Sequence, residues 1–287
     1  MFDNKFPIGI LLDSFGMPFD EALKAAASMG IQGLQLYAVS GEMAPENLGT
    51  AQIAAKRAMI ASYGLEVSAV CGDLGGHGFA RADENPGKIE KSKRIVDLTL
   101  ELGSNIITTH IGVIPDDADS NRYKIMQDAC KQLAEYAYQN NAFFAIETGP
   151  ETAMTLRGFL DSLETPGIGV NLDPANFVMV TAQDPVEAVY VLRDYIVHTH
   201  AKDGVMLKKT DPQILYDFFA EGGIGDINLD QYFREVPLGD GDVPFPAYLK
   251  ALADIGYRGY LTIERETGDD PARDIRLAVE YLRKCGR

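Results

Sequence analysis

The stretch FFAIETGPETAMTLRGFLDSLETPGIGVNLDPAN, residues 143–176, carries the pattern that decides the fold. An apolar run with strand character (143–148) is followed by a segment with helical periodicity (152–163) and then by a second apolar run (168–173). A helix between two such runs predicts a βαβ unit, in which the two strands are parallel. The stretch therefore indicates an α/β protein whose strands are joined by crossover helices.

The same alternation runs from one end of the chain to the other. Strand-like runs are expected at eight places: Pro7–Phe15, Gly33–Val39, Glu66–Gly72, Asn105–Ile111, Phe143–Thr148, Ile168–Asp173, Ile196–Lys202 and Gly259–Glu264. Helical segments are expected at Phe19–Met29, Ala51–Tyr63, Lys88–Leu102, Arg122–Asn140, Thr152–Leu163, Pro185–Asp194, Phe245–Ile255 and Ala272–Lys284. Eight rounds with no second compositional block predict a single-domain (β/α)₈ TIM barrel over residues 1–287. A doubly wound open sheet is the alternative, although its glycine-rich fingerprint after the first strand is missing.

One long interruption, Gly204–Val243, separates the last two expected strands. It contains an amphipathic piece (Pro212–Ala220) and the turn-rich stretch PLGDGDVPFP (237–246). A long loop at the site end of a barrel is commonly a lid or a substrate wall, and a surface insertion without a role is the alternative. GDGD (239–242) lacks the spacing of an EF-hand loop and is expected to be a turn near the site mouth.

Composition limits the classes of function. A net charge of −16 repels nucleic acid and anionic lipid, so we expect neither as a partner. No apolar run is long enough for a membrane helix, and MFDNKFPIGI does not have the form of a secretory signal. The three cysteines, Cys71, Cys130 and Cys285, have no paired spacing and fit a reducing compartment. The expected location is the cytoplasm.

Four residues of metal-ligand type end strand-like runs: Glu147, Asp173, His200 and Glu264. Parallel barrels keep their chemistry at the carboxyl ends of the strands, so these side chains are expected to converge. Three carboxylates and one imidazole suit one divalent cation, Mn²⁺ first, with Mg²⁺, Co²⁺ or Zn²⁺ as alternatives. A lone Glu at a strand end is more often a salt-bridge partner, but four such ends in one chain favour a metal site.

Strand parity supports this interpretation, because side chains two residues apart share a face of a strand. His198, His200 and Lys202 share one face of their strand. Asn171 shares a face with Asp173 in the preceding strand. Polar residues along one face of several strands are typical of a barrel lumen that opens into a site.

The segments NLDPAN, HTHAKD and LTIERE, with AIETGPETA upstream, resemble the xylose isomerase-like sugar phosphate isomerase/epimerase family over nearly the full length. The resemblance implies a (β/α)₈ barrel. It also implies that the family's four metal ligands correspond to Glu147, Asp173, His200 and Glu264. His110, which ends the strand-like run TTHIG, matches a position that the family uses beside the metal for substrate.

Three positions depart from the sugar 3-epimerases of this superfamily. Asn176 stands where they have a His, Met206 where they have an Arg, and Ala153 where they have a further Glu. The HAKD segment is closer to branches that process keto-inositols and related ketosugars. Lys202 is then expected to contact substrate or to act as acid or base, and the alternative is a strand-end lysine paired with a carboxylate such as Asp203. Asn176 is expected to contact the substrate.

Other classes of enzyme fit less well. The apurinic-site endonucleases of the superfamily bind three zinc ions through additional histidines, and this chain has four histidines in all. It has no G-x-S-x-G elbow and no Walker-type phosphate loop. The lack of a basic phosphate cradle favours an unphosphorylated substrate.

These observations predict a divalent-metal-dependent isomerase or epimerase of a small sugar or polyol-derived ketone. Glu147 and Glu264 are expected to remove and return the proton α to the carbonyl through an enediolate. A lyase or dehydratase acting on a keto-inositol-like or ketosugar substrate is the alternative, because both reactions share the first step. A barrel that binds sugar and metal without turnover is a third possibility. Homo-oligomers are common among barrels of this type, so one is possible here.

Overall fold

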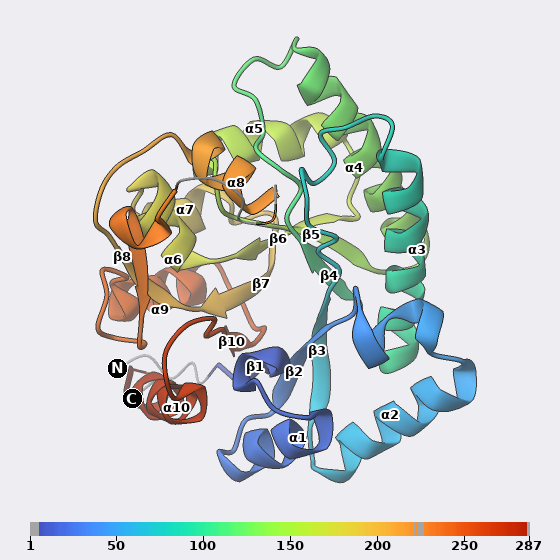
Figure 1. Ribbon diagram of the computed structural model, residues 1–287, viewed down its shortest axis with the longest axis vertical. Coiled ribbons are helices and arrows are strands. Elements are labelled where there is room, and N and C mark those ends of the chain that lie inside the picture. Colours follow the sequence, from blue (N-terminus) through green and yellow to red (C-terminus); the bar gives the residue numbers. More distant parts are fainter. Residues whose placement is uncertain (1–5, 221, 223–226, 286–287) are drawn as a thin grey trace.

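The computed structural model describes residues 6–220, 222 and 227–285, and a closed barrel of eight parallel strands lies at its centre (Figure 1). Around the barrel the strands follow the order β1-β10-β7-β6-β5-β4-β3-β2. Their bounds are β1 Ile8–Leu11, β2 Gly33–Tyr37, β3 Glu66–Cys71, β4 Ile106–Thr109, β5 Phe143–Glu147, β6 Ile168–Leu172, β7 Ile196–Ala201 and β10 Leu261–Ile263. The predicted TIM barrel is confirmed. The ends of the predicted domain, and residues 221 and 223–226 of the predicted interruption, lie outside the described residues.

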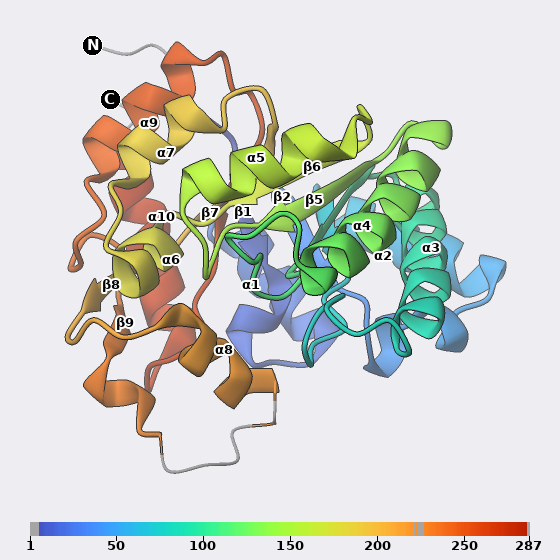
Figure 2. The ribbon, with the colours of Figure 1, turned by 90° about the horizontal axis from the view of Figure 1, so that it is seen from above.

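Helices surround the barrel, as the two views show (Figures 1 and 2). Those at the predicted places are α1 Phe19–Ser28, α2 Thr50–Ser62, α3 Asn85–Leu102, α4 Asn121–Gln139, α5 Ala153–Leu163, α7 Pro185–Val191, α9 Phe245–Asp254 and α10 Pro271–Cys285. Helix α4 begins after Ser120, whose hydroxyl accepts the N–H of Tyr123 at 3.2 Å. In the described part of the chain, no helix combines the length and apolarity that crossing a bilayer would need.

The first strand is shorter than predicted. Strand β1 stops at Leu11, and the rest of the apolar run forms a 3₁₀ turn, η1 (Leu12–Phe15). Gly16 ends this turn with φ +60°, and its N–H donates to the Asp13 carbonyl at 2.9 Å. The sequence predicted a longer strand because Leu12 and Phe15 are apolar core residues, and core residues are apolar in a strand and in a 3₁₀ turn alike.

The barrel lumen is polar at the level of the site. His198 lies between Asn171 and Thr262, with 2.8 Å from Nδ1 to the Asn171 Oδ1 and 2.9 Å from Nε2 to the Thr262 Oγ1. Burial, together with the nearby His200, holds the pKa of His198 well below its usual range. His198 is therefore a neutral, hydrogen-bonded core residue, which avoids the cost of an unpaired buried polar group.

The interruption after β7 folds onto the barrel as a separate unit. An antiparallel hairpin, β8 (Asp203–Met206) with β9 (Phe233–Val236), flanks helix α8 (Pro212–Ala220). The helix has the predicted bounds, whereas the hairpin was not predicted. In Figure 2 the hairpin and α8 lie on the same side of the barrel.

Asp203 fixes the base of this unit. Its carboxylate accepts backbone N–H groups from Gly204 at 2.9 Å, Gly239 at 2.9 Å, Gly241 at 3.1 Å and Val243 at 3.1 Å. A Cβ at Gly241 would lie 2.2 Å from the Asp203 Oδ1, so this position needs glycine. The GDGD segment is thus a turn wrapped around an internal carboxylate.

Candidate active site

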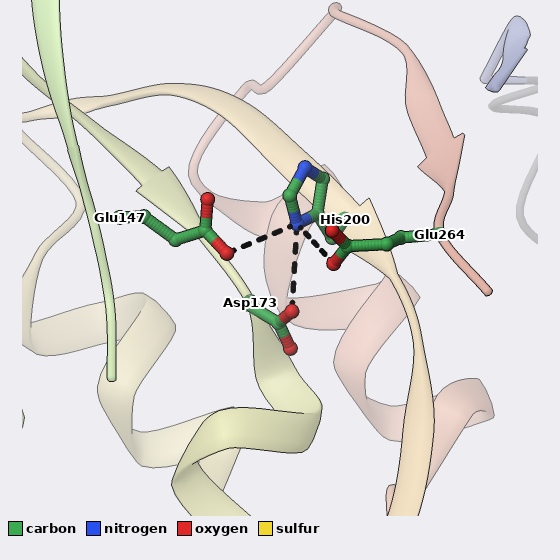
Figure 3. Close-up of side chains that lie close together, drawn as sticks. All are labelled: Glu147, Asp173, His200 and Glu264. Atoms are coloured by element: carbon green, nitrogen blue, oxygen red, sulfur yellow. Dashed lines mark hydrogen bonds and ion pairs between the residues drawn. The ribbon is translucent and has the colours of Figure 1, made fainter. Parts of the chain in front are cut away.

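Four side chains meet at the carboxyl ends of the strands (Figure 3). Glu147 ends β5, Asp173 follows β6, His200 lies near the end of β7, and Glu264 follows β10. One potential ligand atom from each lies within 4.8 Å of the others. All four are buried, with Asp173 0% and Glu264 9% exposed. The residues singled out from the sequence as ligands are therefore brought together in space.

The imidazole of His200 lies at the centre of this cluster. Its Nδ1 is 3.0 Å from the Glu264 Oε2, 3.4 Å from the Asp173 Oδ2 and 3.4 Å from the Glu147 Oε1 (Figure 3). Burial alone would lower the pKa of His200, but the carboxylates of Glu264 and Glu147 raise it well above its usual range. A divalent cation at this cluster would compete with that proton for Nδ1 and would offset the same carboxylates. The hard oxygen donors and single imidazole suit such a cation.

Surrounding side chains orient these donors. His200 Nε2 is 2.8 Å from the Gln35 Oε1, and an amide oxygen only accepts, so this contact requires the proton on Nε2. Gln35 is held in turn by its amide, which donates to the Thr108 Oγ1 at 2.7 Å. Asn171 donates to the Glu147 Oε2 at 3.0 Å. A cation at Nδ1 would displace the proton held there, and the hydrogen bond from Nε2 to Gln35 would then keep the neutral ring with Nδ1 toward the carboxylates, the form that a metal ligand needs.

Asp173 combines two tasks. Its Oδ1 caps the short helix α6 (Pro174–Asn176) by accepting N–H groups from Ala175 at 2.7 Å and Asn176 at 3.1 Å. This leaves Oδ2 directed toward His200. Asn176, predicted to contact substrate, lines the cavity above the cluster and donates its amide to the Thr148 carbonyl at 3.0 Å. Its side-chain oxygen takes no part in that bond and can accept another hydrogen bond.

Lys202 lies beside the Glu264 end of the cluster. Its Nζ is 3.2 Å from the Glu264 Oε2 and 3.9 Å from the Glu235 Oε2, and it also contacts Glu266. Asp203, the pairing partner considered from the sequence, is instead bound to the backbone of the GDGD turn, so that pairing is wrong. Burial would lower the pKa of Lys202, but the Glu264 and Glu266 carboxylates raise it well above its usual range. Lys202 is therefore a charged hydrogen-bond donor within the cavity.

The contact between Lys202 and Glu264 also shifts the pKa of Glu264. Burial alone raises the pKa of this carboxyl, but the neighbouring His200 and Lys202 hold it well below its usual range. Glu264 is consequently a carboxylate with a protonated amine at hydrogen-bond distance.

His110 lies on the opposite, Glu147 side of the cavity. Its Nδ1 is 3.1 Å from the Asp73 Oδ2, and its Nε2 is 3.7 Å from the Glu147 Oε1. Burial would lower the pKa of His110, but Glu147 and Asp73 raise it to about 10. The ring of Tyr216, on α8, lies 6.2 Å from the imidazole between ring centres. His110 is thus a second charged hydrogen-bond donor at the cavity.

A cavity of about 530 Å³ opens above these groups. Its lining includes His110, Glu147, Asn176, Lys202 and Glu264 from the barrel. Helix α8, the turn η5 (Leu229–Gln231) and strand β9 also line it, which makes the insertion part of the cavity. A more open hollow of about 490 Å³, lined from α3 and α4, contains none of these residues.

Sequence reasoning missed four residues of this site. Gln35 is the one polar residue within GLQLY, and strand parity could have placed it in the lumen. Asp73 comes two residues after the end of β3, whereas Asp173 and Glu264 each come one residue after the end of their strands, so the same strand-end rule could have found it. Glu235 and Tyr216 lie within the insertion, where no periodic pattern relates them to the barrel.

Comparisons with known proteins agree with this architecture. A family described as "Xylose isomerase-like TIM barrel" matches residues 23–285. Uncharacterized protein MJ1311 of Methanocaldococcus jannaschii is 23% identical over 68% of this chain and 62% of its own length. The rhizopine catabolism protein MocC of Rhizobium meliloti is 29% identical over 53% of this chain and 44% of its own length. The chain thus matches less than two thirds of either curated relative.

Solved structures match over nearly the whole chain. A xylose isomerase domain protein from Planctomyces limnophilus has a TM-score of 0.79 and 27% identity, covering 98% of this chain and 97% of its own. The probable 3-DHS dehydratase AsbF from Bacillus anthracis has a TM-score of 0.72 and 19% identity, covering 96% and 98%. The 3-keto-D-glucoside 4-epimerase YcjR from E. coli has a TM-score of 0.71 and 18% identity, covering 98% and 100%. On its fold and on the span matched, this chain belongs to the xylose isomerase-like TIM barrel family.

Proposed function

We propose that this protein is a divalent-metal-dependent isomerase or epimerase of a small, unphosphorylated sugar or polyol-derived ketone. The observation that carries the proposal is the convergence of Glu147, Asp173, His200 and Glu264 at the open end of the barrel. These four residues would hold Mn²⁺, Mg²⁺, Co²⁺ or Zn²⁺. When bound, such a cation polarises a carbonyl oxygen and stabilises negative charge that develops on it.

Glu147 and Glu264 are the proposed proton carriers. They come from β5 and β10, which are separated around the barrel by β6 and β7, so they can face different sides of one substrate carbon. One carboxylate removes the proton α to the carbonyl, and the second returns it. Return to the other face of the same carbon gives epimerisation, whereas return to the neighbouring carbon gives aldose–ketose isomerisation.

His110 and Lys202 are the proposed partners of these carboxylates. His110 Nε2 lies 3.7 Å from Glu147, and Lys202 Nζ lies 3.2 Å from Glu264. Each places a donor N–H beside one base, where it can bind a substrate hydroxyl or protonate an oxygen. Asn176 lines the same cavity, and its side-chain oxygen can supply an acceptor. The substrate is thus oriented by groups on both sides of the reacting carbon.

The charges of the cavity support an unphosphorylated substrate. Six acidic residues line it: Asp73, Glu147, Asp230, Glu235, Glu264 and Glu266. Among the described lining residues, the permanently basic side chains are Lys202 and Arg234, and Lys202 is already shared among carboxylates. Even with the charged His110 and a bound divalent cation included, the cavity keeps a net negative charge, which disfavours a phosphate dianion.

A lyase or dehydratase is the second candidate, and the pairing of Lys202 with Glu264 favours it. An ionised base and a protonated amine at 3.2 Å can remove an α proton and assist departure of a β-hydroxyl as water. AsbF, whose fold this chain shares, is described as a probable 3-DHS dehydratase.

Incubation of the protein and Mn²⁺ with a panel of ketoses in D₂O separates these reactions. Deuterium bound to carbon, without loss of water, supports an isomerase or epimerase. A product lighter by one water supports the lyase. Glu147→Gln and Glu264→Gln should each abolish exchange with the circular dichroism spectrum unchanged, and Glu187→Gln, an exposed change on α7, should retain it. No exchange with any ketose, in protein shown to bind Mn²⁺, would favour a binding role and contradict the proposal.

A further inference from the structure

One wall of the cavity is apolar. Five side chains compose this apolar wall and line the same cavity as the proposed catalytic groups: Met179, Val180, Leu215, Phe219 and Phe233. Two come from the π-helical turn η4 (Phe177–Thr181), two from α8 and one from β9. The proposed metal ligands, with His110, Asn176 and Lys202, belong to the barrel strands and the loops that follow them, whereas the insertion brings both these apolar side chains and the polar residues Tyr216, Asp230, Arg234 and Glu235 to the cavity. The five apolar side chains thus add an apolar surface to an otherwise polar cavity.

The apolar wall is held in place by packing with the hairpin. Met179 lies against Gly204 of β8, where an added Cβ would come within 2.3 Å of its sulfur. Phe233 of β9 pairs in register with Met206 of β8. Asp203 binds the far end of the insertion to the start of β8. These contacts make the wall a defined surface of the cavity.

Phe219 and Leu215 differ in how they are exposed. Leu215 is buried, whereas Phe219 is 56% exposed although it lines the cavity. An aromatic ring open to solvent at a cavity gains free energy when an apolar group covers it, about 25 cal/mol per Å² of buried apolar area. This surface is therefore suited to contact with a ligand.

The wall discriminates against hydroxyl groups. None of its side chains carries a hydrogen-bonding group stronger than the Met179 thioether. A sugar hydroxyl placed against it would lose water without gaining a partner, which is unfavourable. The part of the ligand that faces the wall should therefore be apolar, while its hydroxyls face Glu147, Asn176 and Lys202.

We infer that the substrate carries an apolar alkyl or aryl substituent, as in an alkyl or aryl glycoside of a ketosugar, and that this substituent lies against the apolar wall. The inference rests on the proposed function, since it places the ketone end at the metal cluster. A cavity of about 530 Å³ has room for both parts, because ligand pockets of roughly 300–1,000 Å³ enclose drug-sized molecules.

Two measurements test this inference. The first is calorimetric binding of methyl and phenyl β-D-glucoside, neither of which needs to react. The phenyl compound should bind at least about tenfold more tightly, a gain expected for burying most of one ring. The second is turnover, for which the matching methyl and phenyl ketoglucosides should give similar kcat values and a lower KM for the phenyl compound.

Phe219→Ala should remove most of the phenyl advantage in both measurements. Because Phe219 is half exposed, this change should leave the fold intact. Leu277→Ala, which shortens an exposed apolar residue on α10, is the matched control and should keep the advantage.

The outcomes separate the two proposals. Turnover of the methyl ketoglucoside with no tighter binding of the phenyl compounds would overturn this inference and leave the proposed function standing. A phenyl advantage that depends on Phe219, without turnover of any ketoglucoside or of any ketose in the D₂O panel, would support the wall as a ligand surface and contradict the proposed function. A phenyl advantage unaffected by Phe219→Ala would also overturn the inference, because the ring would then bind elsewhere.

Discussion

Replacing Gln35 by Met should weaken metal binding without touching a ligand. The Gln35 Oε1 accepts the Nε2 proton of His200 at 2.8 Å, deep in the lumen, where Gln35 is 1% exposed. Met fills a similar volume but offers no comparable acceptor, so the buried N–H loses its partner at a cost of about 1–3 kcal/mol. Loss of an outer hydrogen bond of this kind lowers metal affinity about 10–100-fold. At about 1.4 kcal/mol per factor of ten, the two figures agree.

Calorimetric titration of EDTA-treated protein with Mn²⁺ measures this effect directly. Gln127→Met is the matched control, because the Gln127 amide donates to the Ser162 carbonyl far from the cluster. Gln35→Glu retains an acceptor for His200 and should recover most of the affinity. Unchanged Mn²⁺ affinity in folded Gln35→Met protein would refute the view that this hydrogen bond selects the ligating tautomer of His200.

Three further predictions concern groups around the cluster. Burial raises the pKa of Glu151 to about 8, and its Oε2 has no hydrogen-bond partner among the described residues. The folded chain thus keeps a proton that the unfolded chain releases above an ordinary pKa of 4.5. The free energy of unfolding should therefore fall as the pH rises from 4.5 to about 8, by up to about 5 kcal/mol. Glu151→Gln should flatten this fall in urea titrations at several pH values, and an unchanged pH profile in the variant would contradict the prediction. Asp203→Asn turns one acceptor oxygen into a donor that faces two N–H groups, so it should lower the free energy of unfolding by about 2–4 kcal/mol and speed amide exchange at Gly239. Asp240→Asn, an exposed change in the same turn, should do neither. Equal exchange rates in both variants would contradict the anchoring role of Asp203. Asp73→Asn should lower the pKa of His110 from about 10, because the negative charge of Asp73 is one of the groups that raise it. An NMR titration of metal-free protein measures this pKa, and an unchanged pKa would show that Asp73 does not act on the imidazole.

The repeating alternation of apolar runs and helical segments was enough to predict the barrel. Each strand is buried on both faces, so it reads as a short apolar run, and each helix shows its own period. The predicted end of β1 was wrong because an apolar run predicts burial, and burial does not distinguish a strand from the 3₁₀ turn Leu12–Phe15. The hairpin β8–β9 was missed because its two short strands are separated by α8, and pairing at that distance leaves no periodic signal.

The candidate cluster could be predicted because barrel topology brings the ends of all strands to one face. This rule placed Glu147, Asp173, His200 and Glu264 together without any knowledge of distances. Barrel topology does not determine which carboxylate a flexible lysine pairs with, so the neighbouring Asp203 was considered as the partner of Lys202. Three of the four backbone N–H groups that bind Asp203 come from 36 to 40 residues downstream, beyond the reach of local reasoning.

The location of a bound cation tests the central claim most directly. Crystals of the protein grown with Mn²⁺ should give one anomalous-difference peak per chain, about 2.0–2.6 Å from donor atoms of Glu147, Asp173, His200 and Glu264. A well-ordered map with those four side chains and no peak between them, or with the only peak elsewhere, would contradict the account.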